Sequence, residues 1–166
     1  MVLVDCSKNV AHAAKFFALL ESLYVFISST KAHVLFLQKQ TELYPTQPKR
    51  ELKRLSDTRW VCRYAAVDTM CRTFNALIAT LKEIIVGEDH DKAVQASGLL
   101  LQVKSFSFLL LLIIFDRILS CTKRLSDLLQ SQQCNLAKAA NLVSTTVETL
   151  EKFRSDSSWK HLFDYA

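Results

Sequence analysis

Apolar residues recur along the chain at spacings of three and four residues, the pattern of amphipathic α-helices. Breaks in this pattern are few, since 166 residues contain only two glycines and two prolines. We expect five helical segments and a short amphipathic end piece from Trp159. The segments cover about residues 9–26, 31–42, 59–86, 88–129 with a bend at 104–105, and 136–153. The predicted fold class is all-α, a bundle of long helices in one domain of residues 1–166.

The apolar run FSFLLLLIIF, residues 106–115, predicts a helix buried on all sides. About ten residues is half of what a bilayer span needs, so we expect no membrane association. The inward-facing residues expected within the later helices are Phe108, Leu111, Leu112 and Phe115; Tyr64, Val67, Cys71, Phe74, Ile78, Leu81 and Ile85; and Leu142, Val143, Val147 and Leu150.

One loop stands out, over residues 43–58, because it holds both prolines and many basic residues. The net charge of the chain is +5, and the stretch 49–63 carries six basic residues against two acidic ones. Such a patch can neutralise phosphates. The alternative is a solvated basic loop without a ligand. The basic residues are Lys49, Arg50, Lys53, Arg54, Arg59 and Arg63.

Trp60 follows Arg59 in the stretch LSDTRW, at the expected start of a helix. A tryptophan there is commonly a core residue. Beside arginines it can instead stack on an unpaired base. The residues alone leave both roles open.

Sequence motifs of catalysis are not found. The chain has no glycine-rich phosphate loop, no nucleophile elbow and no zinc-protease motif. Five cysteines occur without a CxxC pair, which favours thiols in a reducing compartment over a metal site. The first residues, MVLVDCSKN, lack the features of a signal peptide. We therefore expect no metal, no cofactor and no small-molecule substrate.

The segment LSDTRWVCRYAAV, residues 55–67, resembles the "RW" segment of hAT-type transposases and their domesticated vertebrate relatives, such as the zinc-finger MYM-type proteins. Residues 2–36 resemble the helices that precede this segment in the family, and residues 96–130 resemble those that follow it. The likeness rests on this ordered series more than on the RW pair, and it covers nearly the whole chain.

The resemblance implies an all-helical insertion domain, which in the family interrupts an RNase H-like fold. The three catalytic acids of the family lie in the RNase H-like part, which the resemblance does not cover. No acid of this chain, Asp5 included, matches them. Arg59 and Trp60 match the RW pair, whose tryptophan is associated in the family with a flipped base.

The predicted function is that of a non-catalytic, transposase-derived helical domain in the nucleus, binding DNA through the basic loop and Arg59-Trp60. One alternative is a protein-interaction module whose open edges are covered by another protein chain, and the cytoplasm is the alternative location. Another is a remnant fragment without a selected function.

Overall fold

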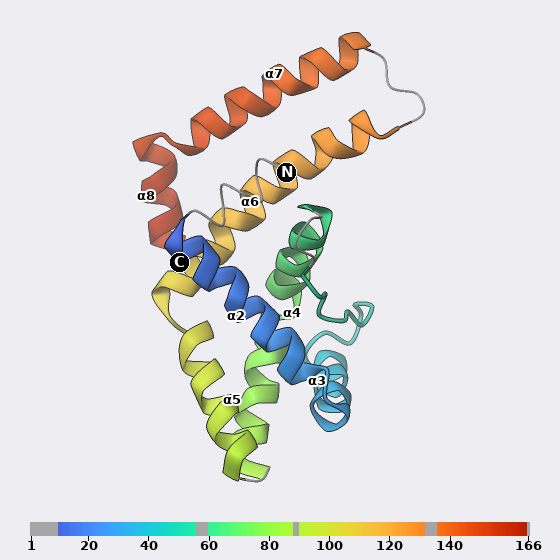
Figure 1. Cartoon of the computed structure of the whole chain (residues 1–166), viewed down its shortest axis with the longest axis vertical. Helices are drawn as coiled ribbons and strands as arrows, with labels where there is room; N and C mark the ends of the chain where they lie inside the picture. Colours follow the sequence, from blue (N-terminus) through green and yellow to red (C-terminus); the bar gives the residue numbers. More distant parts are fainter. Residues whose placement is uncertain (1–9, 56–59, 88–89, 132–135, 166) are drawn as a thin grey trace. The chain divides into compact units, whose positions relative to one another are not determined.

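The computed structural model describes residues 10–55, 60–87, 90–131 and 136–165 (Figure 1). Every regular element within these ranges is a helix, which confirms the all-α fold class. The helices are α2 (Ala11–Ile27), α3 (Thr30–Leu43), α4 (Trp60–Gly87), α5 (His90–Val103), α6 (Phe106–Leu129), α7 (Leu136–Phe153) and α8 (Asp156–Tyr165).

Short local signals set the helix ends. The direction of the chain turns by 101° between α2 and α3, where the hydroxyls of Ser28 and Ser29 donate back to carbonyls of α2. The non-helical segment after Leu43 contains Pro45, which disfavours helical backbone at Tyr44. At the start of α6 the Ser105 hydroxyl accepts the Phe108 N–H at 3.2 Å, an N-cap that fixes the predicted bend.

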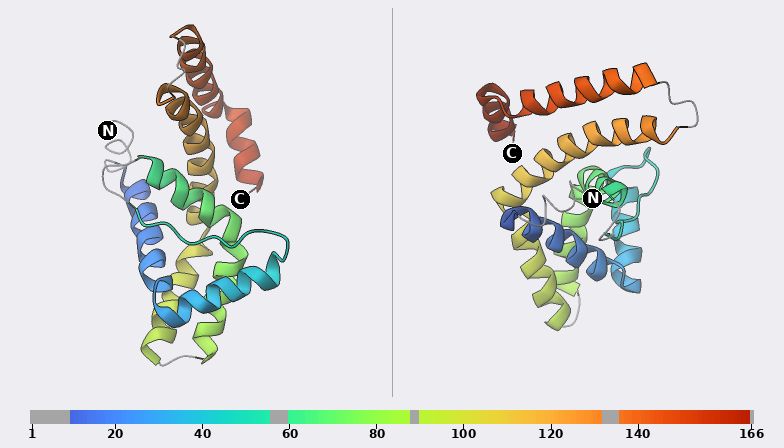
Figure 2. Two further views of the ribbon diagram at one scale, coloured as in Figure 1. Left: turned by 90° about the vertical axis from the view of Figure 1, so that its right-hand side faces the viewer. Right: turned by 45° about the horizontal axis from the view of Figure 1, so that its top comes forward.

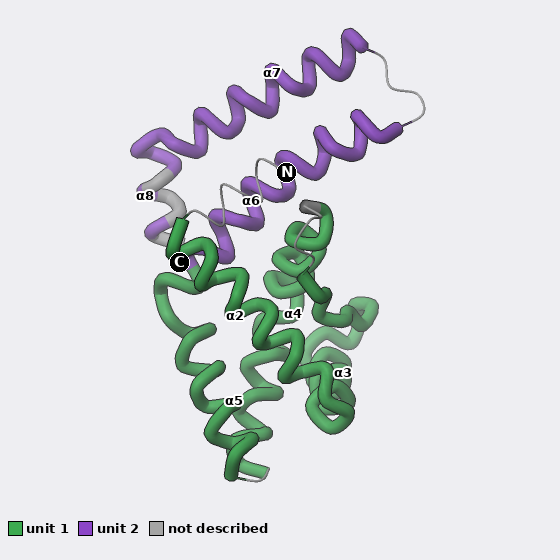
Figure 3. The backbone as a smooth tube through the Cα atoms, viewed as in Figure 1, with its two compact units in different colours: residues 1–109 green, residues 110–166 purple. Residues whose placement is uncertain are grey.

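The chain divides into two compact units, residues 1–109 and 110–166 (Figure 3), whereas the sequence predicts one domain. The boundary falls inside α6, in the middle of the apolar run. No polar or glycine-rich linker marks it, because a continuous helix makes the connection. Composition therefore gives no sign of the division.

In unit 1, α4 packs against both α3 and α5, and α2 also contacts both (Figures 1 and 2). The side chains of this core are largely aliphatic, with an aromatic pair, Phe16 and Phe17, edge to face at 5.2 Å. Apolar residues of unit 1 with no exposed surface are Leu23, Phe36, Val67, Ala76, Leu77, Leu81, Ala96 and Val103.

The predicted inward stripe of α4 is only partly correct. Val67 and Leu81 are fully buried, but Cys71 is exposed and the other four residues are half-buried. The structure buries Met70, Leu77 and Ile84 instead, together with the polar Thr69, Thr73 and Thr80. Thr73 and Thr80 can be buried because their hydroxyls donate to helix carbonyls, at 2.8 and 2.7 Å. Because three of the buried residues are threonines, a prediction from apolar spacing alone did not find the buried face of α4.

An ion-pair cluster joins α3 to α4. Lys39 Nζ lies 2.9 Å from Glu42 Oε2 and 2.7 Å from Glu83 Oε2. Hydrogen bonds to Glu42, and then to Glu83, raise the pKa of Lys39, and the bond from Lys39 lowers the pKa of Glu42. The stabilisation is therefore lost as pH falls through the lowered pKa of Glu42 or rises through the raised pKa of Lys39.

Burial of the apolar run in α6 follows one face. Phe108, Leu112 and Phe115 are buried as predicted, whereas Leu111 is half-buried and Phe106 is 44% exposed. The expectation of burial on all sides is wrong, because a run that is apolar on every face gives no indication of which face packs.

The inward face predicted for α7 also needs correction. Val143 and Val147 are exposed, while Leu142 and Leu150 are half-buried. Its buried residues are the small Ala139 and Thr146. The larger Val143 and Val147 thus lie on the exposed side of the helix.

No single helix of the described residues is long and apolar enough to cross a membrane. The pairs α2 with α3 and α5 with α6 meet that criterion only when the two helices are taken together across a bend.

We expect Leu112→Ala to lower the free energy of unfolding by about 2–5 kcal/mol, the usual cost of a cavity at a buried leucine. Leu111→Ala, one residue away and half-buried, should cost clearly less. Urea denaturation of the full chain measures both. Equal losses for the two variants would contradict the one-sided burial of α6.

Candidate nucleic-acid interface

The non-helical segment between α3 and α4 is held in place by a buried amide. Gln40 on α3 is only 4% exposed. Its Oε1 accepts the Arg50 N–H and its Nε2 donates to the Arg50 carbonyl, both at 2.8 Å. One side chain therefore satisfies both backbone groups of Arg50, as a neighbouring strand would.

Two carboxylates fix the rest of this segment. Asp68 of α4 accepts from the Arg50 guanidinium at 3.2 Å and from Arg72 Nε at 2.7 Å. Glu21 of α2 accepts the Leu55 N–H at 3.0 Å and lies 3.6 Å from Arg54 Nε. Two of the predicted phosphate-binding arginines thus already have carboxylate partners within the fold.

Lys49 and Lys53 differ from these arginines. Both are exposed, and neither has an ion pair or side-chain hydrogen bond within the described part of the chain. The segment 49–55 contains four basic residues against Glu51 alone. Glu51 itself lies 3.3 Å from His33 Nε2 on α3. The ammonium groups of Lys49 and Lys53 are therefore available to a ligand. The backbone that carries them is held by three hydrogen bonds, at the Arg50 N–H, the Arg50 carbonyl and the Leu55 N–H.

A cavity of about 440 Å³ lies beside Lys53, within unit 1. Its walls come from the end of α2, the start of α3 and the basic segment. The lining residues are Tyr24, Ile27, Ser28, His33, Glu51, Leu52, Lys53 and Arg54.

Arg63 does not belong to the exposed basic surface, so this part of the prediction is wrong. It is 6% exposed, and its guanidinium carbon lies 4.2 Å from the centre of the Phe17 ring. This is a cation–π contact, in which the face of the aromatic ring attracts the buried guanidinium. Arg63 lies one helical turn after the start of α4, on the face toward the core. Its position three residues after Trp60 did not indicate this burial.

Arg59 lies outside the described residues, as do Asp57 and Thr58 before it. Trp60 is described as the first residue of α4, without its side chain. Whether the indole is buried or exposed therefore stays a prediction.

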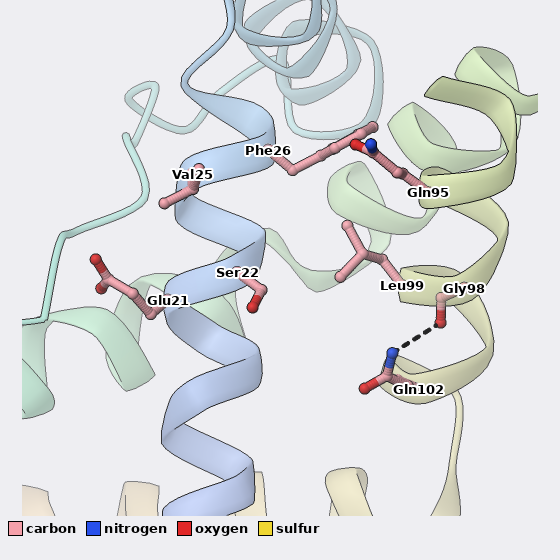
Figure 4. A pocket seen from close by; sticks show the side chains of 8 residues that line it. All are labelled: Glu21, Ser22, Val25, Phe26, Gln95, Gly98, Leu99 and Gln102. Atoms are coloured by element: carbon pink, nitrogen blue, oxygen red, sulfur yellow. Dashed lines mark hydrogen bonds between the residues drawn. The ribbon is translucent and has the colours of Figure 1, made fainter. Parts of the chain in front are cut away.

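A second cavity of unit 1, about 450 Å³, lies between α2 and α5 (Figure 4). Phe26 and Leu99 reach into the space between the helices, with Gln95 and Gln102 at its rim. A side chain at Gly98 would meet nothing within 4 Å, so packing does not require a glycine there. Apart from Glu21 at its edge, no ionisable group lines this cavity.

Sequence reasoning missed the residues that fix the loop, namely Glu21, Gln40 and Asp68. A signal existed for one of them. Ala32, Phe36 and Gln40 are the buried residues of α3, at spacings of four, so Gln40 continues an apolar stripe. A polar residue in that register needs a buried partner.

Within the described residues no group of three or more histidine, cysteine, aspartate or glutamate side chains could hold a metal ion. Cys62, Cys71 and Cys121 form no disulfide there. Comparisons with protein-family models, curated proteins and solved structures found no match to the chain.

We expect Gln40→Ala to cost about 1–3 kcal/mol, since it leaves two backbone groups of Arg50 unsatisfied. The segment should then open locally, and trypsin should cut faster after Lys49, Arg50, Lys53 and Arg54 in native conditions. Gln38→Ala is the matched control, because Gln38 is exposed and bonds only to Glu42. Unchanged cleavage in Gln40→Ala would mean that the amide does not fix the loop.

Proposed function

We propose that the chain is a transposase-derived helical domain that binds DNA through the basic segment 49–55 and the start of α4. The observation that carries this proposal is the division of roles in the segment. Arg50 is half-buried and pairs with Asp68, and Arg54 lies 3.6 Å from Glu21 at the surface, while Lys49 and Lys53 are exposed and have no ion pair within the described residues.

Anchoring matters for phosphate binding because it lowers the entropy lost on association. A freely moving basic loop must be ordered when it binds, whereas the backbone of this segment is already bonded to α2 and α3. Lysine ammonium groups act as point charges toward phosphate and tolerate variable geometry. Contacts of this kind give affinity without sequence preference.

The resemblance of residues 55–67 to the RW segment supports a DNA ligand over other polyanions. It also supports a role in binding without chemistry, since none of the residues of this chain match the family's catalytic acids. The location that goes with this proposal is the nucleus, with the cytoplasm as the alternative.

A protein-interaction module is the second candidate. The observation in its favour is the exposed apolar surface of α7, where Leu136 is 87% exposed and Val143 and Val147 accompany it. These residues lie in unit 2, so the two candidates rest on different parts of the chain.

Replacing Lys49 and Lys53 together by alanine should weaken binding to every duplex sequence tested. The log–log dependence of affinity on salt should also become shallower, by about 0.9 for each phosphate that is no longer neutralised. Fluorescence anisotropy with labelled duplexes at several salt concentrations measures both effects. Lys82→Ala with Lys104→Ala is the control, since both lysines are exposed in unit 1 and the charge change is equal. If both double variants weaken DNA binding equally, the change in net charge alone explains the loss, and a specific role of Lys49 and Lys53 is contradicted.

Trp60→Ala tests the stacking role separately. We expect it to weaken binding to DNA with an unpaired or extruded base more than to intact duplex, because stacking contributes about 1–3 kcal/mol per base. The change in stability should stay below about 1.5 kcal/mol, less than the roughly 3–5 kcal/mol of a core tryptophan. Thermal denaturation and two binding titrations provide the comparison. A large stability loss with equal effects on both DNAs would identify a core residue instead.

A further inference from the structure

A cavity of about 260 Å³ lies between α6 and α7, lined entirely by residues of unit 2. Its volume is close to the lower end of the range for small-molecule sites. The lining residues are Arg117, Ser120, Cys121, Arg124, Leu142, Thr145, Thr146, Thr149 and Phe153.

The wall from α6 is one stripe of the helix. Arg117, Ser120, Cys121 and Arg124 follow the spacing i, i+3, i+4 and i+7, which places them on the same face. The two arginines start about 10 Å apart along the axis, and each side chain is long enough to lean toward the middle of the stripe. Ser120 and Cys121 lie at that middle.

The charge in this cavity is entirely positive. No carboxylate lines it, and neither Arg117 nor Arg124 has an ion pair or side-chain hydrogen bond within the described residues. Two nearby acids are engaged elsewhere, since Asp127 pairs with Lys123 and Glu148 accepts from Ser144. An anion that binds between the two guanidinium groups therefore meets no competing carboxylate in the lining.

The rest of the lining is mainly apolar. Leu142 and Phe153 of α7 contribute hydrocarbon surface, and so do the threonine methyl groups. The hydroxyls of Thr145, Thr146 and Thr149 donate to carbonyls of their own helix, at 2.9, 2.6 and 2.7 Å. The donors left for a ligand are therefore the two guanidinium groups and the Ser120 hydroxyl.

We propose that this cavity binds a small organic phosphate, with the phosphate between Arg117 and Arg124 and an apolar body against Leu142 and Phe153. Arginine favours this chemistry because its planar donors match tetrahedral oxyanions with paired hydrogen bonds. The ligand is bound and not converted. The site belongs to unit 2, so it does not depend on DNA binding by the basic segment of unit 1.

Cys121 reports occupancy, because it is half-buried in the lining. The full chain is treated with iodoacetamide at increasing phenyl phosphate, and alkylation is mapped by mass spectrometry. We expect saturable protection of Cys121, at least about fivefold, with no protection of Cys71, an exposed thiol of unit 1. Phenol at the same concentrations should not protect, since it lacks the anion. Inorganic phosphate should protect only at higher concentration, since it lacks the apolar body.

The arginines are tested by Arg117→Gln with Arg124→Gln, which should abolish protection. Lys138→Gln with Arg154→Gln removes the same charge from exposed positions of unit 2 and should retain it. Circular dichroism verifies that both variants keep their helix content. If Cys121 is slow to react, titration calorimetry with phenyl phosphate replaces the alkylation assay. The proposal is overturned by the absence of binding in the unmodified chain, by protection that phenol or sodium sulfate reproduces, or by protection that survives loss of both arginines.

Discussion

Unit 1 is organised around the buried face of helix α4. The helix contacts both α3 and α5, and its side chains from Ala66 to Ile84 supply much of the buried surface. Three threonines share this burial, and two of them satisfy their hydroxyls within the helix. Because α4 is fixed in this way, Asp68 is held at a position where it can bind the loop that precedes the helix.

The loop shows how a basic segment can serve two purposes. Gln40 binds both backbone groups of Arg50, and Glu21 binds the Leu55 N–H. Glu21 and Asp68 each also pair with an arginine of the segment. These contacts satisfy polar groups that lie outside any helix. Lys49 and Lys53 take no part in this network, so their charge is available to a ligand. Basic residues that look equivalent in the sequence therefore have two roles. Arg50 and Arg54 help to hold the loop, whereas Lys49 and Lys53 are exposed to a ligand.

Three different settings are seen among the described guanidinium groups of Arg50, Arg54, Arg63, Arg117 and Arg124. Arg50 and Arg54 pair with carboxylates, Arg63 lies over the Phe17 ring, and Arg117 and Arg124 face a cavity without acids. The burial and the neighbours of each group decide its role. A count of basic residues cannot separate a structural arginine from one that can bind phosphate.

Local signals in the sequence are enough to predict the helices and their approximate ends. The range of α7, Leu136–Phe153, is the range predicted, and Ser105 ends the predicted bend as an N-cap. These features depend on spacing, proline and capping residues within a few positions. The helix α8 starts at Asp156, earlier than predicted, because Ser155 precedes it as an N-cap whose hydroxyl accepts the Ser158 N–H at 3.4 Å.

Packing between helices, in contrast, settles which faces are buried and which basic residues are available. The apolar run of α6 has no polar face to orient it, and the buried face of α4 contains threonines. The burial of Arg63 depends on Phe17, and the fixing of Arg50 depends on Gln40 and Asp68. Each of these partners lies ten or more residues away in the sequence, and no spacing rule reaches that far. Contacts of this kind exist only when separate helices are packed together.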